Sequence, residues 1–180
     1  MSVHPSDARS LGINMIAYAL ATQRIGQYQS TARVFYGQDR EDAAGFQFAQ
    51  AKIGDNWDTQ TNAIANLLKT VATETSTDVK FAHKAVDITD DQLLQYPFLY
   101  LTGHRDFTLS EKQVAALRRY LRRGGFLLAS PCCGSKKFNQ AFRREIKRVL
   151  PYKSLSKLPA DHAVYHIKNN ISKVNYNRYM

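Results

Sequence analysis

Residues 97–138, PFLYLTGHRDFTLSEKQVAALRRYLRRGGFLLASPCCGSKKF, decide the fold of this chain. Two short apolar runs within them, 98–101 and 126–129, show no polar alternation, which is typical of strands buried on both faces of a parallel sheet. A helical pattern separates the two runs, and each run ends in a small polar loop, TGHRD (102–106) or SPCCGS (130–135). Because the loops at the carboxyl ends of such strands form the binding crevice in open α/β sheets, we expect the functional site there.

The helix between the two runs has clear start and stop signals. Ser110 and Gln113 have the spacing of a capping box. Gly124 and Gly125 follow the last helical turn, where a left-handed residue is favoured. The arginines of the last two turns are interpreted as a solvated helix face rather than as a nucleic-acid site; they are Arg118, Arg119, Arg122 and Arg123.

Further elements are predicted from apolar periodicity along the rest of the chain. The first part of the chain predicts a helix over 6–21, a polar stretch over 23–33 with a break at Gly26, an exposed loop over 37–45, and strands over 46–53 and 79–86 with a helix between them. The last part predicts a helix capped by Ser135, with Arg143, Arg144, Lys147 and Arg148 outward, and a short strand ending the segment ADHAVYHI (160–167). Four strands separated by helices predict an α/β, three-layer sandwich: a mostly parallel, doubly wound sheet with helices on both faces.

Length and composition restrict the possible partners. The 180 residues, 44% of them hydrophobic, suffice for one domain with its own core. The formal charge of +10 favours acidic partners, which include nucleic acid, anionic lipid and small anions, without choosing among them.

Cysteine content and hydropathy bear on the compartment. The two cysteines are adjacent, so no disulfide framework is indicated and a reducing compartment is the default. No apolar run approaches the roughly 20 residues of a membrane span, and MSVHPSDARS does not have the pattern of a signal peptide. These features favour the cytoplasm for the chain as given; an excerpt of a longer protein would leave a periplasmic or envelope location open.

Two segments, YPFLYLTGH (96–104) and GGFLLASPCCGSKKFNQAFRREIKRVLP (124–151), together with the helix between them, resemble a bacterial family of unknown function, DUF4159. The resemblance extends from about Phe46 to His166. It implies a flavodoxin-like fold similar to that of class I glutamine amidotransferases, and a place within larger cell-envelope proteins. Two departures are visible: Ser130 and Pro131 stand where the family carries acidic residues, and the family pattern continues beyond the end of this chain.

The first helix raises a question of domain organisation. Its core, LGINMIAYAL (11–20), resembles the helix that closes such domains. We therefore hypothesise that it is either the tail of a preceding domain or part of a rearranged copy; a helix that does not pack on the sheet would exclude the second version. The expected division is an N-terminal helix and linker over 1–33 and an amidotransferase-like domain over 34–180, with truncation at its C-terminus left open.

The cysteine loop carries the catalytic hypothesis. Class I amidotransferases have a Gly-x-Cys-x-Gly nucleophile elbow after a strand, and Cys132-Cys133-Gly134 keeps its second half. A thiol at a helix N-terminus is activated by the helix dipole. No His-x-Glu occurs, so His104 and His162 are the candidate bases for Cys132 or Cys133. The alternative is that both cysteines pack as small apolar residues in a tight turn.

The binding hypothesis is preferred over catalysis. It predicts a non-catalytic module that holds a small anionic or carboxylate ligand, or a protein partner, near the N-terminus of a helix. A cysteine-dependent hydrolase or amidase that uses Cys132, and nucleic-acid binding through the basic helices, remain as alternatives. No cofactor or metal is predicted. Cys132, Cys133, His104 and His162 could in principle supply zinc ligands, but their spacing matches no zinc pattern and adjacent cysteines seldom bind one ion together. The predicted ligand-binding residues are Thr102, Gly103, His104, Arg105, Asp106, Ser130, Gly134, Ser135 and Lys136.

Overall fold

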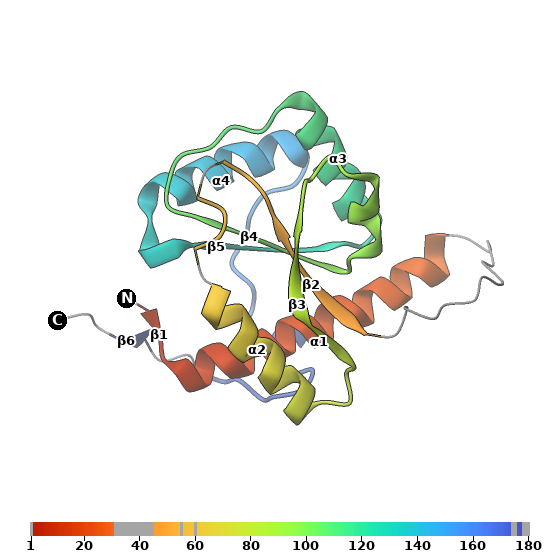
Figure 1. The fold of residues 1–180 in the computed structure, drawn as a ribbon, viewed down its shortest axis with the longest axis vertical. Helices are drawn as coiled ribbons and strands as arrows, with labels where there is room; N and C mark the ends of the chain where they lie inside the picture. The colour runs from red at the N-terminus through yellow and green to blue at the C-terminus, as the bar shows by residue number, and fades with distance from the viewer. Residues whose placement is uncertain (1, 31–44, 55, 60, 174–175, 178–180) are drawn as a thin grey trace.

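The structure, a computed structural model, describes residues 2–30, 45–54, 56–59, 61–173 and 176–177. Helices and strands alternate along the chain (Figure 1). Three short 3-10 turns cover Asp91–Gln95, Cys132–Gly134 and Ala163–Tyr165. The main elements are β1 (Ser2–Val3), α1 (Pro5–Ser30), β2 (Phe46–Ala51), α2 (Thr61–Glu74), β3 (Val79–Val86), β4 (Phe98–Gly103), α3 (Glu111–Arg122), β5 (Phe126–Pro131), α4 (Lys136–Val149) and β6 (Tyr176–Asn177).

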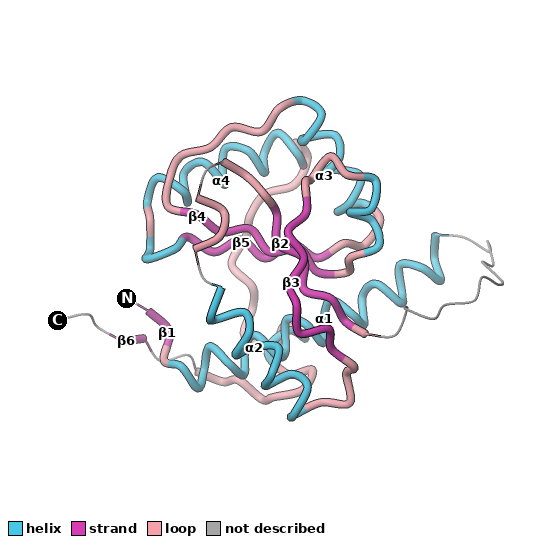
Figure 2. The backbone as a smooth tube through the Cα atoms, in the orientation of Figure 1, coloured by secondary structure: helices cyan, strands magenta, loops and turns pink. Residues whose placement is uncertain are grey.

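The central sheet has four parallel strands in the order β3-β2-β4-β5 (Figure 2). This is the order of the first four strands of a flavodoxin-like sheet, so the predicted α/β class and all four strands are confirmed. Strands β4 and β5 run two residues further than the sequence indicated. Thr102 pairs with Ser130 and Gly103 with Pro131, which makes the first residues of both polar loops part of the sheet.

Helices cover both faces of the sheet, as expected for a three-layer sandwich (Figure 1). Successive strand residues point to opposite faces. Leu99 and Leu101 of β4 therefore join the core cluster shared with α3 and α4, while Phe98 and Tyr100 join the cluster shared with α1 and α2.

Helix α1 packs on the sheet and is longer than predicted. It continues through Gly26 to Ser30, so the predicted break at that glycine is wrong. Ile13, Ile16 and Ala19 are buried in the same core cluster as Phe98, so the rearranged-copy version of the hypothesis for this helix is not excluded. The expected division at 33/34 and most of the expected loop over 37–45 lie outside the described residues.

The segment after α4 departs from the prediction. The strand expected within 160–167 is absent from this described segment, and a 3-10 turn forms at Ala163–Tyr165 instead. Its cause is local, because the His162 Nδ1 accepts a hydrogen bond from the Val164 N–H at 3.2 Å. Val164 is buried, and the Asn14 side chain of α1 anchors the following residues through Asn169.

The boundaries of α3 agree with the sequence signals. The Ser110 and Gln113 side chains form the capping box in both directions, and Gly124 has φ +87° beyond the helix end. Gly125 has a separate reason to be glycine, since a Cβ there would lie 2.4 Å from the Tyr120 ring. That ring is buried, and its hydroxyl donates to the Phe126 carbonyl at 3.1 Å.

Some arginines of α3 and α4 are engaged within the fold, which corrects the sequence interpretation in part, whereas Arg122 and Arg123 are exposed as expected. Arg118 donates to the Val149 and Arg148 carbonyls at the end of α4, at 2.8 and 2.7 Å. Arg119 pairs with Asp91. Arg144 and Arg148 both pair with Glu145, whose side chain is only 2% exposed.

Glu145 is the centre of this network. Its carboxylate also accepts the Leu109 N–H at 3.2 Å. Arg144 continues to Asp106 and the Phe107 carbonyl, and Arg148 to the Leu109 carbonyl. Burial alone would raise the pKa of Glu145, but the hydrogen bonds from Arg144, the Leu109 N–H and Arg148 outweigh it and hold that pKa below its ordinary value.

We predict that Glu145→Gln lowers the free energy of unfolding at neutral pH by about 3 kcal/mol, the low end for a broken buried ion pair, because both arginines can be hydrated again. Since the folded-state pKa is depressed, the stabilisation is complete above the pKa of the unfolded glutamate. It is lost as pH falls through the folded-state value. The difference between wild type and variant in urea unfolding must therefore shrink on acidification.

Glu111→Gln is the matched control, because Glu111 pairs with Arg148 but its side chain is 87% exposed. Its effect should stay within about 0.5 kcal/mol. Equal losses in the two variants would show that the burial of Glu145 is energetically unimportant.

Candidate functional site

The two predicted polar loops lie side by side at the carboxyl edge of the sheet, because β4 and β5 are neighbours in register. A direct contact joins them: the Ser135 Oγ donates to the His104 carbonyl at 2.5 Å. The same hydroxyl accepts the Phe138 N–H as the N-cap of α4, as its sequence position predicted. The loops are therefore held at a fixed distance from each other and from the start of α4.

Three of the predicted ligand-binding residues are engaged within the sheet edge. Thr102 is 1% exposed and donates to the Ser130 carbonyl at 2.8 Å. Gly103 lies against Phe138, where a Cβ would be 3.1 Å from the ring. These residues shape the floor of the site.

Asp106 and Arg105 have different surroundings. The Asp106 carboxylate pairs with Arg144 at 2.8 Å, and this hydrogen bond keeps the pKa of Asp106 below its ordinary value. Asp106 thus fastens the loop to α4. Arg105 is exposed, and the described residues offer it no ion pair.

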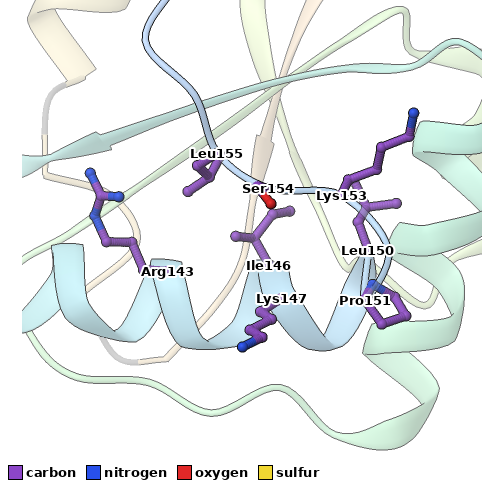
Figure 3. A pocket seen from close by; sticks show the side chains of 8 residues that line it. All are labelled: Arg143, Ile146, Lys147, Leu150, Pro151, Lys153, Ser154 and Leu155. Carbon is purple, nitrogen blue, oxygen red and sulfur yellow. The ribbon is translucent and has the colours of Figure 1, made fainter.

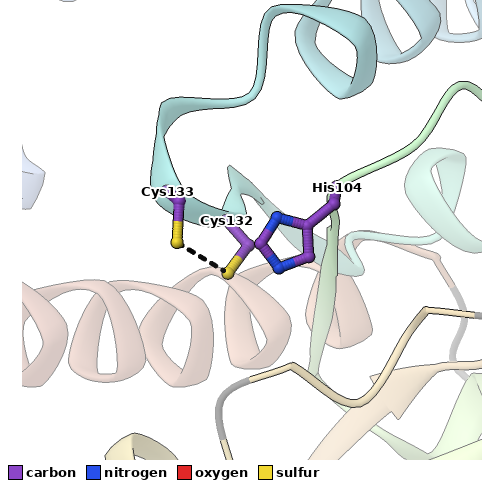
Figure 4. Close-up of side chains that lie close together, drawn as sticks. All are labelled: His104, Cys132 and Cys133. Atoms are coloured by element: carbon purple, nitrogen blue, oxygen red, sulfur yellow. Dashed lines mark hydrogen bonds between the residues drawn. The ribbon is translucent and has the colours of Figure 1, made fainter.

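The cysteine turn brings both thiols to the same side (Figure 4). Cys132 is buried at 4% exposure, whereas Cys133 is exposed. Cys133 has φ +53°, a left-handed conformation that is uncommon for a residue with a side chain. The two Sγ atoms lie 3.7 Å apart. The hydrogen bond with Cys132 and the proximity of its charge raise the pKa of Cys133 above the ordinary thiol value.

His104 is the histidine that the fold brings to the thiols. A ring nitrogen of His104 and the two Sγ atoms all lie within 4.8 Å of one another (Figure 4). The ring is exposed and, within the described part of the chain, has neither a hydrogen-bond partner nor a carboxylate to orient it.

His162, the other candidate base, lies elsewhere. Its ring packs on Tyr18, with centroids 5.4 Å apart, and Tyr18 also contacts Phe126 at 6.0 Å. Phe126 begins β5, whereas the cysteines follow the end of β5. A six-residue strand separates these ends by roughly 16 Å, so His162 is out of reach of both thiols.

Sequence reasoning missed the loop after β2. Thr59 Oγ1 lies 3.4 Å from Thr102 Oγ1, and the Asn56 carbonyl borders Gly103. Gln50 is fully buried beneath the loop and donates to the Trp57 carbonyl at 2.5 Å, while its Oε1 has no partner in the described structure. The sequence alone does not give the strand order; in the structure the order β3-β2-β4-β5 reverses between β2 and β4, and ligands bind at such a point in open α/β sheets.

A separate pocket of about 340 Å³ lies along the C-terminal half of α4, away from the cysteine turn (Figure 3). It is lined by Arg143, Ile146, Lys147 and Leu150, and by Pro151, Lys153, Ser154 and Leu155 of the segment that follows the helix. It contains none of the predicted site residues. No helix within the described ranges has the length and hydropathy needed to cross a bilayer.

Comparison with known proteins shows that the chain matches the model of one protein family. The family model described as domain of unknown function (DUF4159) matches residues 47–179, well over half of the chain. A search of the curated proteins found no match.

We predict that the two thiols differ in alkylation. Cys132 should react only after unfolding, because it is buried. Cys133 should react slowly at about pH 7 and accelerate only above about pH 8.5, because its pKa is raised. Iodoacetamide labelling followed by mass spectrometry at each residue measures both rates, with the guanidinium-unfolded chain as control. Fast labelling of folded Cys133 at about pH 7 would instead reveal an activated thiolate.

Proposed function

This chain belongs to the DUF4159 family, and we propose that it is a non-catalytic binding domain that holds a small anionic or carboxylate ligand at the carboxyl edge of its sheet. We assign it an amidotransferase-like fold. Support for that assignment comes from the flavodoxin-like strand order and from the strand-turn-helix position of the cysteine turn.

The observation that carries the proposal is that some cationic side chains bind groups within the fold, whereas those beside the site have no ion pair in the described structure. Arg118, Arg119, Arg144 and Arg148 are bound to carbonyls or carboxylates within the fold. Arg105, Lys136 and Lys137 are exposed at the site, and the structure records no ion pair for them within the described residues.

Lys136 and Lys137 are the first two residues of the 14-residue helix α4, and Arg105 follows His104, whose carbonyl accepts a hydrogen bond from the N-cap Ser135. The free N–H groups and dipole of a helix start favour an anion. A ligand there would also meet the loop after β2, so the binding crevice spans the point where the strand order reverses. Because four arginines already bind carbonyls or carboxylates within the fold, fewer cations on α3 and α4 are left to contact phosphates, which weakens the case for a nucleic-acid surface there.

The state of the thiols and of His104 supports binding over acyl transfer. A nucleophilic cysteine needs a nearby base that a third group orients. Cys132 is buried, and the described residues place no carboxylate on the His104 ring. The exposed apolar side chains of Tyr152, Leu155 and Leu158 are consistent with a protein partner within a larger, envelope-associated assembly.

We predict that phosphate or citrate, added to ¹⁵N-labelled protein, shifts the amide resonances of Gly134–Phe138 and Thr102–Arg105. The double variant Lys136→Gln/Lys137→Gln should weaken this binding about tenfold, since two charged contacts worth about 0.7 kcal/mol each at an exposed site amount to about 1.4 kcal/mol. Circular dichroism would verify that the variant is folded.

Arg143→Gln/Lys147→Gln is the matched control, because it also removes two charges and both residues are exposed in the C-terminal half of the same helix. Its affinity should equal that of wild type. Equal weakening in both variants would mean that the anion responds only to the overall charge of +10, and the proposed site would be rejected.

A second candidate, a cysteine hydrolase, is favoured by the left-handed conformation of Cys133 beside His104. It would transfer an acyl group to the Cys133 sulfur and then to water. We expect no acetyl adduct on Cys133 after incubation with p-nitrophenyl acetate at neutral pH. An adduct that forms in wild type and is abolished by His104→Gln would establish this candidate in place of the binding function.

A further inference from the structure

The cluster formed by His104, Cys132 and Cys133 joins three side chains of the type that ligate soft metal ions. They come from two loops that are far apart in sequence and adjacent at the sheet edge (Figure 4). Sequence spacing gave no sign of this arrangement, because adjacent cysteines ordinarily project apart. The conformation of Cys133, φ +53°, reverses that expectation.

The distance between the sulfurs fits one ion. Tetrahedral zinc with Zn–S bonds of about 2.3 Å holds two thiolates about 3.8 Å apart, and the Cys132 and Cys133 Sγ atoms lie 3.7 Å apart. A zinc-bound imidazole nitrogen would lie about 3.5 Å from each sulfur. Because the three ligand atoms already lie within 4.8 Å of one another, a small rotation of the exposed His104 side chain is sufficient.

The backbone strain at Cys133 points the same way. A residue with a Cβ in the left-handed region costs roughly 1–2 kcal/mol relative to its relaxed conformation. Glycine would remove that cost, and the next residue, Gly134, has φ +70° without strain. The presence of cysteine rather than glycine at position 133 is explained if the Cys133 thiol is needed beside that of Cys132.

We propose that His104, Cys132 and Cys133 bind one Zn²⁺ ion, with a fourth coordination position open toward the crevice. Binding releases the two thiol protons to solvent, so the two thiolates balance the charge of the ion and no redox step is involved. The open position takes water or an oxygen of the anionic ligand. The inference rests on the proposed function only for this last contact.

The experiment measures metal binding to the reduced, metal-free protein. Since these are the two cysteines of the chain, a thiolate-to-metal charge-transfer band on Co²⁺ addition must come from this site. We expect one Co²⁺ per chain, displaced by one Zn²⁺. X-ray absorption at the zinc edge should give two sulfur ligands and at least one nitrogen. A spectrum with no sulfur ligand, or no binding at micromolar metal, would overturn the proposal without recourse to any variant.

Variants then assign the ligands. Cys133→Ser and His104→Gln should each lower the Zn²⁺ affinity by at least about 100-fold, beyond the range for residues that only support a ligand. His4→Gln, which removes an exposed histidine outside the cluster, should leave it unchanged. An unchanged Zn²⁺ affinity in Cys133→Ser would overturn the proposal. So would a guanidinium-unfolded wild type that binds Zn²⁺ as tightly as the folded protein.

The metal and anion proposals can fail independently. Phosphate titration of the metal-free protein tests the α4 site alone. Phosphate binding without zinc binding would reject the metal site and leave the proposed function intact. Zinc binding without phosphate binding to either form would keep the metal site and reject the proposed function.

Discussion

The geometry of this protein depends on one buried carboxylate. Glu145 lies on the inner face of α4, 2% exposed, and holds Arg144, Arg148 and the Leu109 N–H. Through the two arginines it fastens residues 106–109 to the helix. The same helix begins directly after the cysteine turn, so one element fixes both loops of the site.

This network is better understood as a positional constraint than as a source of stability. Taking charges out of water offsets most of their mutual attraction, and an apolar residue of similar volume can stabilise a core as well as a buried ion pair. A leucine at position 145 would fill the space but would leave the Leu109 N–H without its acceptor. The loop after β4 would still be held by Arg144 and Arg148, but their guanidinium groups would no longer be positioned by the buried carboxylate.

Features with local causes were predictable from the sequence, and features that depend on distant partners were not. The capping box at Ser110 and the turn at Gly124 are each encoded within a few residues. Glu145 sits at helical spacing from buried Phe138, Ala141 and Val149, which was a usable sign of its burial. Its partners and the location of His162 depend on contacts between segments that no local pattern specifies.

The site combines fixed and adjustable parts, which bears on what it can bind. The main chain of His104 is held by Ser135 on one side, and two residues later Asp106 is held by Arg144. The thiols are set by the backbone of a short turn between β5 and α4. The imidazole of His104 is exposed and has no hydrogen bond within the described residues. Two fixed sulfurs and one movable nitrogen suit an ion that closes the cluster on binding, because a rotation about the His104 side chain disturbs neither loop.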